Sequence, residues 1–126
     1  MTGPDLKRRK AFHRGLDAEK QTGDYLTSLG FELLAQRYKT KYGEIDLIMQ
    51  RENLVIFVEV KARPSFKEGA YSVTPQAQKR IANSALLWIA ENAAALGSDM
   101  EFRFDVAIMT PDDTITMIEA AFEANG

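Results

Sequence analysis

Leu54-Val55-Ile56-Phe57-Val58-Glu59-Val60-Lys61 is the most apolar run in the chain. Its first five residues are all β-branched, aromatic or leucine, which predicts a strand covered on both faces. Glu59 and Lys61 end the run and stand two residues apart, so they share one face of that strand. Charged side chains in such a place need partners, because removing them from water costs free energy.

A second apolar stretch, residues 45–49, is interrupted by Asp46. The polar residues 51–53 between the two stretches are short enough for a hairpin turn, which places Asp46 on a strand next to Glu59 and Lys61. Two acids and a lysine on neighbouring strands can hold a divalent metal ion over a phosphate. Spacing alone also fits a Glu–Lys pair on a strand face, which contributes little if it is exposed.

The other elements follow from apolar periodicity and from turn residues. The expected helices and strands alternate with loops, and the strand after the second helix should run parallel to residues 54–61 through a right-handed crossover. The sequence therefore predicts an α/β fold with a mixed sheet in αβββαβ order, flanked by helices. The expected segments are a helix at 12–29, strands at 31–35, 44–49 and 54–61, a loop at 63–72, a helix from Thr74 to about 95, a strand at 102–109 and an edge strand at 115–118.

Length and composition limit the possible chemistry. The 126 residues predict one domain at 13–122, with a flexible basic tail at 1–12 and a short tail at 123–126. The absence of cysteine excludes disulfides and thiol catalysis, and the single histidine, His13, argues against a catalytic triad. Metal ligands would then be carboxylates and carbonyls, which suit Mg²⁺ or Mn²⁺. No apolar run is long enough for a bilayer, so we expect a cytoplasmic protein without a membrane partner.

The net charge of −2 conceals an asymmetry along the chain. Residues 1–63 carry 12 Lys/Arg and 9 Asp/Glu, whereas residues 64–126 carry 4 and 9. Much of the basic excess lies in the cluster 7–10 and at Arg14. This cluster is either a solvated end of the chain or an arm that binds phosphate.

The candidate site residues can be assigned chemical roles in phosphodiester hydrolysis. Asp46 and Glu59 would hold the metal ion, and the carbonyl of Val60 would be a further ligand. Lys61 would either stabilise developing negative charge or act as a base, and the sequence leaves both roles open. Glu44 shares a strand face with Asp46 and is a candidate supporting acid, with an exposed edge glutamate as the alternative.

The chain resembles a known family. Gly43-Glu44-Ile45-Asp46-Leu47-Ile48, followed by Phe57-Val58-Glu59-Val60-Lys61-Ala62-Arg63, is similar to the YraN-like bacterial proteins. That family is placed in the PD-(D/E)xK nuclease superfamily and is similar to archaeal Holliday junction resolvases. The likeness continues through residues 73–81, 103–106 and 118–122, so that it spans roughly 15–122.

The resemblance implies a restriction-endonuclease-like core in which Asp46, Glu59 and Lys61 are the superfamily's acid, acid and lysine. It also implies that Glu19 completes the metal site and that Gln78, near a helix N-terminus that attracts phosphate, faces it. A solvated glutamate and a surface glutamine are the alternatives. The candidates for contacts with the DNA backbone are Arg14, Arg63, Lys79, Arg80 and Arg103.

Four positions depart from the expected pattern, among them Ala18 and Gly23, which stand where a glycine and an alanine are expected. Ile45 replaces the proline before the first acid, as is usual in these relatives, and Ala77 stands where relatives often carry a basic residue. Arg63 and Arg103 have a second interpretation as partners of acids, and we expect Asp105 to pair with Arg103 only loosely.

The expected function is that of a metal-dependent endonuclease that uses Mg²⁺ or Mn²⁺ on branched or structured DNA. The two-fold symmetry of such a substrate favours a homodimer. Two alternatives stay open: an inactive nucleic-acid-binding module of the same fold, and a protein-interaction domain that uses the acidic half.

Overall fold

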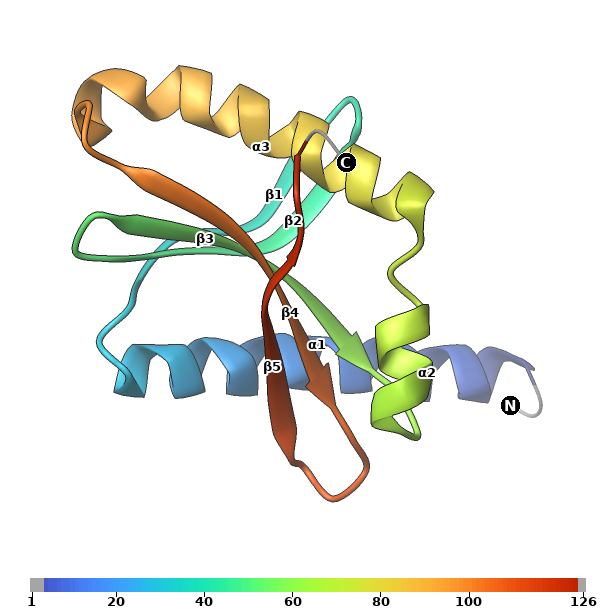
Figure 1. Cartoon of the computed structure of the whole chain (residues 1–126). Helices are drawn as coiled ribbons and strands as arrows, with labels where there is room; N and C mark the ends of the chain where they lie inside the picture. Colours follow the sequence, from blue (N-terminus) through green and yellow to red (C-terminus); the bar gives the residue numbers. More distant parts are fainter. Residues whose placement is uncertain (1–3, 125–126) are drawn as a thin grey trace.

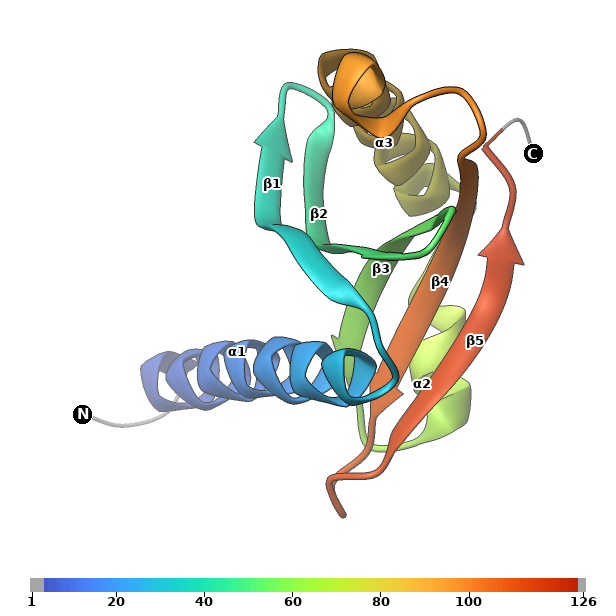
Figure 2. The same cartoon turned by 90° about the vertical axis from the view of Figure 1, so that its left-hand side faces the viewer.

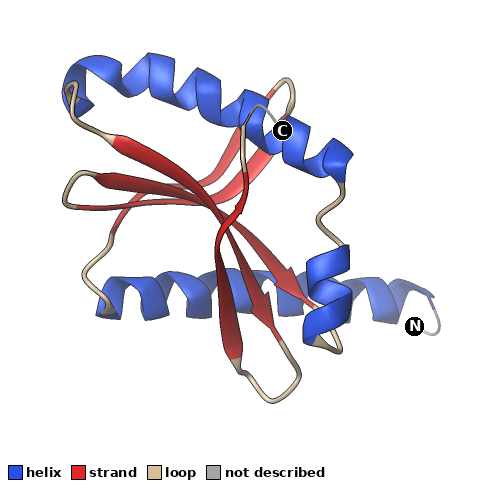
Figure 3. Ribbon diagram, viewed as in Figure 1, coloured by secondary structure: helices blue, strands red, loops and turns tan. Residues whose placement is uncertain are grey.

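A computed structural model describes residues 4–124 of the chain, and its side chains from residue 14 onward. One sheet lies between the long helices α1 (Pro4–Ser28) and α3 (Pro75–Leu96), as Figures 1 and 3 show. The short helix α2 (Phe66–Tyr71) packs against strand β4. This arrangement confirms an α/β fold of the restriction-endonuclease type, with helices on both sides of the sheet.

The sheet has five strands in the order in which they occur along the chain. Strands β3 and β4 are parallel, and every other neighbouring pair is antiparallel. The predicted mixed sheet and the parallel return after α3 are therefore confirmed, and Figure 2 shows the strong turn of the β1–β2 hairpin away from the other strands. The strands are β1 (Glu32–Thr40), β2 (Gly43–Arg51), β3 (Leu54–Ala62), β4 (Glu101–Met109) and β5 (Ile115–Phe122).

The apolar run in β3 is buried on both faces, as its composition predicts. On one face Phe57 packs edge-on against Trp88 of α3 and stacks on Phe104 of β4. On the other face Ile56 and Val58 belong to a second cluster that includes Leu26 of α1. The alternating side chains of one strand thus join both helices to the sheet.

Helix α1 begins at Pro4, eight residues before the predicted start near residue 12. Proline is tolerated at the first helical position, and the lysines, arginines and alanine that follow are good helix formers. Residues 7–10, which carry the basic cluster, therefore lie within helix α1. Of the predicted tails, positions 1–3 and 125–126 lie outside the described residues. None of the described helices is long and apolar enough to span a membrane.

The two outer strands are longer than predicted. Strand β1 continues to Thr40, past the predicted end at residue 35, because Tyr38 packs on the core and donates a hydrogen bond to Glu91 of α3. Strand β5 continues to Phe122, whose ring stacks on Phe104 at a centroid distance of 4.9 Å. Each extension therefore has a side-chain contact that a single-strand pattern does not show.

The predicted loop at 63–72 contains helix α2, so that prediction was wrong. Ser65 caps the helix by accepting a hydrogen bond from the backbone N–H of Glu68. Gly69 is the buried residue of α2, and a Cβ added there would lie 2.5 Å from Cγ2 of Ile108. The helix can approach β4 this closely only because the residue is glycine.

Gly69→Ala is expected to destabilise the protein by about 1–3 kcal/mol, because the added methyl overpacks the contact with Ile108. Urea unfolding measures the change. Gly23→Ala in α1 is the matched control, since a Cβ there would meet no described atom within 4 Å outside the helix's own backbone. The control should be neutral or stabilising by up to about 1 kcal/mol. Equal stability of Gly69→Ala and wild type would contradict the packing described for α2.

Candidate metal-nuclease site

The candidate site lies where strands β2 and β3 part. Their paired register ends at Leu47 and Val58, although β2 stays paired with β1 as far as Gly43. Immediately beyond the last pair, Oδ2 of Asp46 accepts a hydrogen bond of 2.7 Å from the backbone N–H of Val60. The carboxylate of Asp46 thus replaces the missing ladder bond and is held against β3.

Glu59 and Lys61 project from β3 beside Asp46. Nζ of Lys61 lies 3.5 Å from Oε1 of Glu59, and their side chains are only 22% and 15% exposed. Asp46, Glu59 and Lys61 line one cavity of about 340 Å³ together with residues of the β1–β2 turn and of α3. The structure therefore brings the three predicted catalytic residues together. The additional lining residues with polar side chains are Tyr42, Glu44 and Arg80.

Glu19 approaches Asp46 from α1, although it lines a different cavity from Glu59 and Lys61. Carboxylate oxygens of Glu19, Glu44 and Asp46 all lie within 4.8 Å of one another. Oε2 of Glu19 is buried and receives no hydrogen bond from any described residue, although the guanidinium of Arg37 lies 3.4 Å away. A buried carboxylate oxygen without a donor, beside two other carboxylates, fits a hard divalent cation such as Mg²⁺ or Mn²⁺. The carboxylate oxygens of Glu19, Glu44 and Asp46 therefore suit the expected metal.

Burial and neighbouring charge raise the pKa of two of the acids, Glu59 and Glu19. Burial, reinforced by the neighbouring Asp46, raises the pKa of Glu59 to about 8, although Lys61 acts in the opposite direction. Burial and the neighbouring Asp46 also raise the pKa of Glu19 to about 7, against the opposing effect of Arg37. Near neutral pH the acids therefore retain protons that a divalent cation would displace.

The raised pKa values predict a pH dependence of stability. Glu59 and Glu19 bind protons more tightly in the folded protein than in the unfolded chain. The free energy of unfolding that this difference contributes is fully present below pH 4.5 and is lost as the pH rises toward 8. In the presence of EDTA, the free energy of unfolding should fall by about 2 kcal/mol or more between pH 4.5 and 8.5. Urea unfolding of wild type and Glu59→Gln measures it. The variant should lose most of the slope, and a wild-type profile that is flat or rising would contradict these raised pKa values.

Two of the predicted phosphate-binding arginines lie next to the acidic cavity. Arg14 and Arg63 line a neighbouring cavity of about 250 Å³, and Lys61 lines both cavities. Nη1 of Arg63 donates to the backbone carbonyl of Ala62, which holds the guanidinium near the end of β3. Arg80 lines the acidic cavity from α3. A cationic surface thus continues from the acidic cavity across Lys61.

Other predicted site residues lie elsewhere. The amide of Gln78 donates to the carbonyl of Val73, and this side chain lines a different cavity, next to β4 and β5. Lys79 is exposed beside Arg80 but lines neither of the two cavities described above. For Val60, the N–H group contacts Asp46, while the ligand role of its carbonyl stays a prediction.

Arg103 is engaged in an ion pair that we expected to be loose. Its Nε and Nη2 each donate a hydrogen bond of 2.8 Å to Asp105, which is 1% exposed. Asp105 also accepts from the backbone N–H of Ala120. The expectation was wrong because a buried carboxylate must be satisfied by several donors, and residues two apart on a strand are close enough to provide them. Arg103 therefore has a structural partner, and Glu119 lies 3.8 Å from its Nη1.

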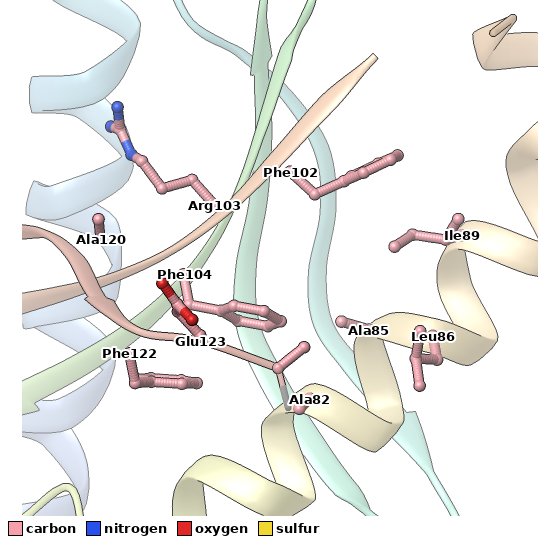
Figure 4. Close-up of a pocket in the computed structure, with 11 residues that line it drawn as sticks. Ala82, Ala85, Leu86, Ile89, Phe102, Arg103, Phe104, Ala120, Phe122 and Glu123 are labelled. Atoms are coloured by element: carbon pink, nitrogen blue, oxygen red, sulfur yellow. The ribbon is translucent and has the colours of Figure 1, made fainter. Parts of the chain in front are cut away.

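A groove larger than the acidic cavity has different chemistry. It encloses about 520 Å³ between α3 and the strands β4 and β5, and it is lined by Leu86, Ile89 and Phe102 among other mainly apolar residues. Figure 4 shows these three side chains on one side, with Arg103 pointing away from them. Since none of Asp46, Glu59 and Lys61 lines this groove, size alone does not identify the site.

Two residues of the site were missed by sequence reasoning. Tyr42 in the β1–β2 turn lines the acidic cavity, and Arg37 in β1 pairs with Glu19. The signal for Arg37 was the hairpin register, since Gln36 pairs with Leu47 and Tyr38 with Ile45, leaving Arg37 opposite Asp46. The strand predicted at 31–35 ends before Arg37, so the predicted elements did not place Arg37 opposite Asp46.

The fold is that of a restriction-endonuclease-like domain, and the family match described next places it in the PD-(D/E)xK-like nuclease superfamily. The sequence comparisons then give the family. The chain belongs to the uncharacterised protein family UPF0102, also called the YraN family, whose model matches residues 18–109.

Named relatives cover nearly the whole chain. The UPF0102 protein of Bradyrhizobium diazoefficiens is 41% identical over 119 residues, which are 94% of this chain and 88% of that protein. A UPF0102 protein of Rhodopseudomonas palustris strain CGA009 is 44% identical over 94% of this chain and 90% of its own length. A Nitrobacter winogradskyi relative is 42% identical over 91% and 96%. These names state the family and no activity.

Proposed function

We propose that this protein is a metal-dependent endonuclease that hydrolyses phosphodiester bonds in branched or structured DNA. The observation that carries the proposal is the convergence of Asp46, Glu59 and Lys61 in one cavity at the parting of β2 and β3. Glu19 adds a buried carboxylate oxygen without a hydrogen-bond donor among the described residues. This donor set supports a site for Mg²⁺ or Mn²⁺.

The residues of the site divide the chemistry among them. Asp46, Glu59 and Glu19 would hold the cation. The oxygens of Glu19, Glu44 and Asp46 lie within 4.8 Å of one another, and Glu59 lines the same cavity as Glu44 and Asp46. A bound divalent cation offsets phosphate charge and makes water more acidic. Nζ of Lys61 lies 3.5 Å from Oε1 of Glu59, so its ammonium would stabilise charge that develops on the phosphate.

DNA would be bound mainly through contacts with its phosphates. Arg14 and Arg63 line a cavity that shares Lys61 with the acidic cavity, so a strand that crosses Lys61 would present a neighbouring phosphate to these arginines. Contacts of this kind position DNA without reading its sequence. The proposed substrate is therefore recognised by shape and backbone. A homodimer would match the two-fold symmetry of a four-way junction, and sedimentation with and without junction DNA tests that assembly.

A panel of linear, flapped and four-way DNA, each with Mg²⁺ or Mn²⁺, tests the proposed function. Cleavage of branched forms in preference to linear duplex is the expected result. DNA binding without cleavage of any form would instead favour an inactive nucleic-acid-binding module. Failure to bind DNA even at low salt, where phosphate contacts are strongest, would favour a protein-interaction domain.

A further inference from the structure

Arg37 occupies an unusual place in strand β1. It lies opposite Asp46 in the hairpin register, at the point where β2 leaves β3. Its φ of 51° is in the left-handed region, which a long side chain rarely adopts inside a strand. Backbone strain of this kind persists where surrounding structure fixes it, and it is frequent at functional sites. The distortion therefore marks Arg37 as part of the acidic site.

The guanidinium of Arg37 is directed to one carboxylate of that site. Its Nε lies 3.4 Å from Oε2 of Glu19, the same oxygen that is buried without a hydrogen bond from the described residues. The Glu19 side chain is 13% exposed, whereas that of Arg37 is 41% exposed. The glutamate end of the ion pair is thus mostly buried in the cluster, whereas the arginine end is partly open to solvent.

We propose that Arg37 is the resident counter-cation of the metal-free acidic cluster, and that it exchanges Glu19 for a DNA phosphate when a divalent cation binds. The inference rests on the proposed function, because it takes Glu19 and Asp46 as metal ligands. A divalent cation held by these oxygens would repel the guanidinium and would replace it as the counter-charge of Glu19. Guanidinium groups bind phosphate oxygens through paired hydrogen bonds, so a phosphate at the site offers the displaced group a new partner.

A purely supporting role for Arg37 makes the opposite prediction about metal affinity. If the ion pair only holds Glu19 in position, removal of the guanidinium loosens a ligand and weakens metal binding. If Arg37 instead competes with the metal for Glu19, its removal strengthens metal binding. The sign of the change therefore separates the two roles without any measurement of catalysis.

The test is a calorimetric titration of Mn²⁺ into the whole chain in the absence of DNA. Arg37→Asn removes the charge with a residue that tolerates the left-handed region, and Arg37→Gly is a second such variant if the first does not fold. Both should bind Mn²⁺ roughly fivefold or more tightly than wild type. Arg37→Lys, which keeps the charge, should stay close to wild type. Lys67→Ala is the control, because it removes one exposed charge from α2, where it lines neither the acidic nor the arginine-containing cavity, and should change the affinity less than about twofold.

A second measurement follows the proposed exchange. Affinity for four-way DNA is compared between wild type and Arg37→Asn, in EDTA and in Ca²⁺, which oxygen ligands also bind. The variant should lose roughly fivefold or more in affinity with Ca²⁺ and less than about twofold in EDTA. Unchanged or weaker Mn²⁺ binding by both uncharged variants, or an equal DNA defect with and without the cation, would overturn the inference. Wild type that binds no Mn²⁺ would overturn the proposed function itself.

Discussion

Asp46→Asn is expected to reduce Mn²⁺ affinity by about 100-fold or more and to abolish DNA cleavage, while it raises the stability of the metal-free protein. Asp46 contributes to the raised pKa values of both Glu59 and Glu19, so it is the charge that these two acids share. Its loss removes a central ligand of the proposed metal site. The same change removes repulsion among buried carboxylates, which should stabilise the fold by about 1 kcal/mol or more.

The local structure should survive this substitution. Asp46 accepts the N–H of Val60 through one oxygen, and the amide oxygen of asparagine can accept the same hydrogen bond. Calorimetric Mn²⁺ titration and urea unfolding of the same sample measure the two effects together. Asp17→Asn, at an exposed position of α1, is the control and should change neither quantity. Mn²⁺ binding by Asp46→Asn equal to that of wild type would remove Asp46 from the site.

Lys61→Met is expected to lower the rate of DNA cleavage by about 100- to 1,000-fold, with Mn²⁺ binding retained. The ammonium lies 3.5 Å from Glu59 and lines both the acidic and the arginine-containing cavity. Removing one preorganised charge from the place where phosphate charge develops is the physical cause of the loss. Methionine keeps the unbranched apolar stem, so the substitution removes the charge with little change in packing.

Single-turnover cleavage in Mg²⁺, with Mn²⁺ titration of the same preparation, measures this effect. Lys67→Met is the matched control, since Lys67 is an exposed lysine of α2 that lines none of the cavities described here. It should cleave within about twofold of wild type. Loss of Mn²⁺ binding in Lys61→Met would mean that Lys61 orders the ligands, and a rate equal to that of wild type would exclude Lys61 from catalysis.

The sequence predicted the central strands because their signal is local. Residues 54–61 are apolar on both faces, and β3 is buried on both faces. Helix α2 was missed because it has six residues, follows Pro64 and contains Gly69, so no apolar stripe can develop. Its position depends on the contact of Gly69 with Ile108, which lies far away in the sequence.

The site was predictable to a different degree for each residue. Asp46, Glu59 and Lys61 stand on strands joined by a short hairpin, so their proximity follows from local pairing. Arg37 depends on the register and length of β1, which are set by contacts with α3 such as the hydrogen bond between Tyr38 and Glu91. The side chains of Gln78 and Arg103 are directed by hydrogen bonds to the Val73 carbonyl and to Asp105, and residue spacing does not predict these bonds.

The most direct test of the central claim is cleavage of a four-way DNA by wild type and Lys61→Met, purified side by side, with Mg²⁺ and with EDTA. The central claim is that Asp46, Glu59 and Lys61 form one metal-dependent nuclease site. It predicts cleavage by wild type only with Mg²⁺, and a loss of about 100-fold or more in Lys61→Met. Equal cleavage by the two proteins, or cleavage by wild type that persists in EDTA, would contradict it.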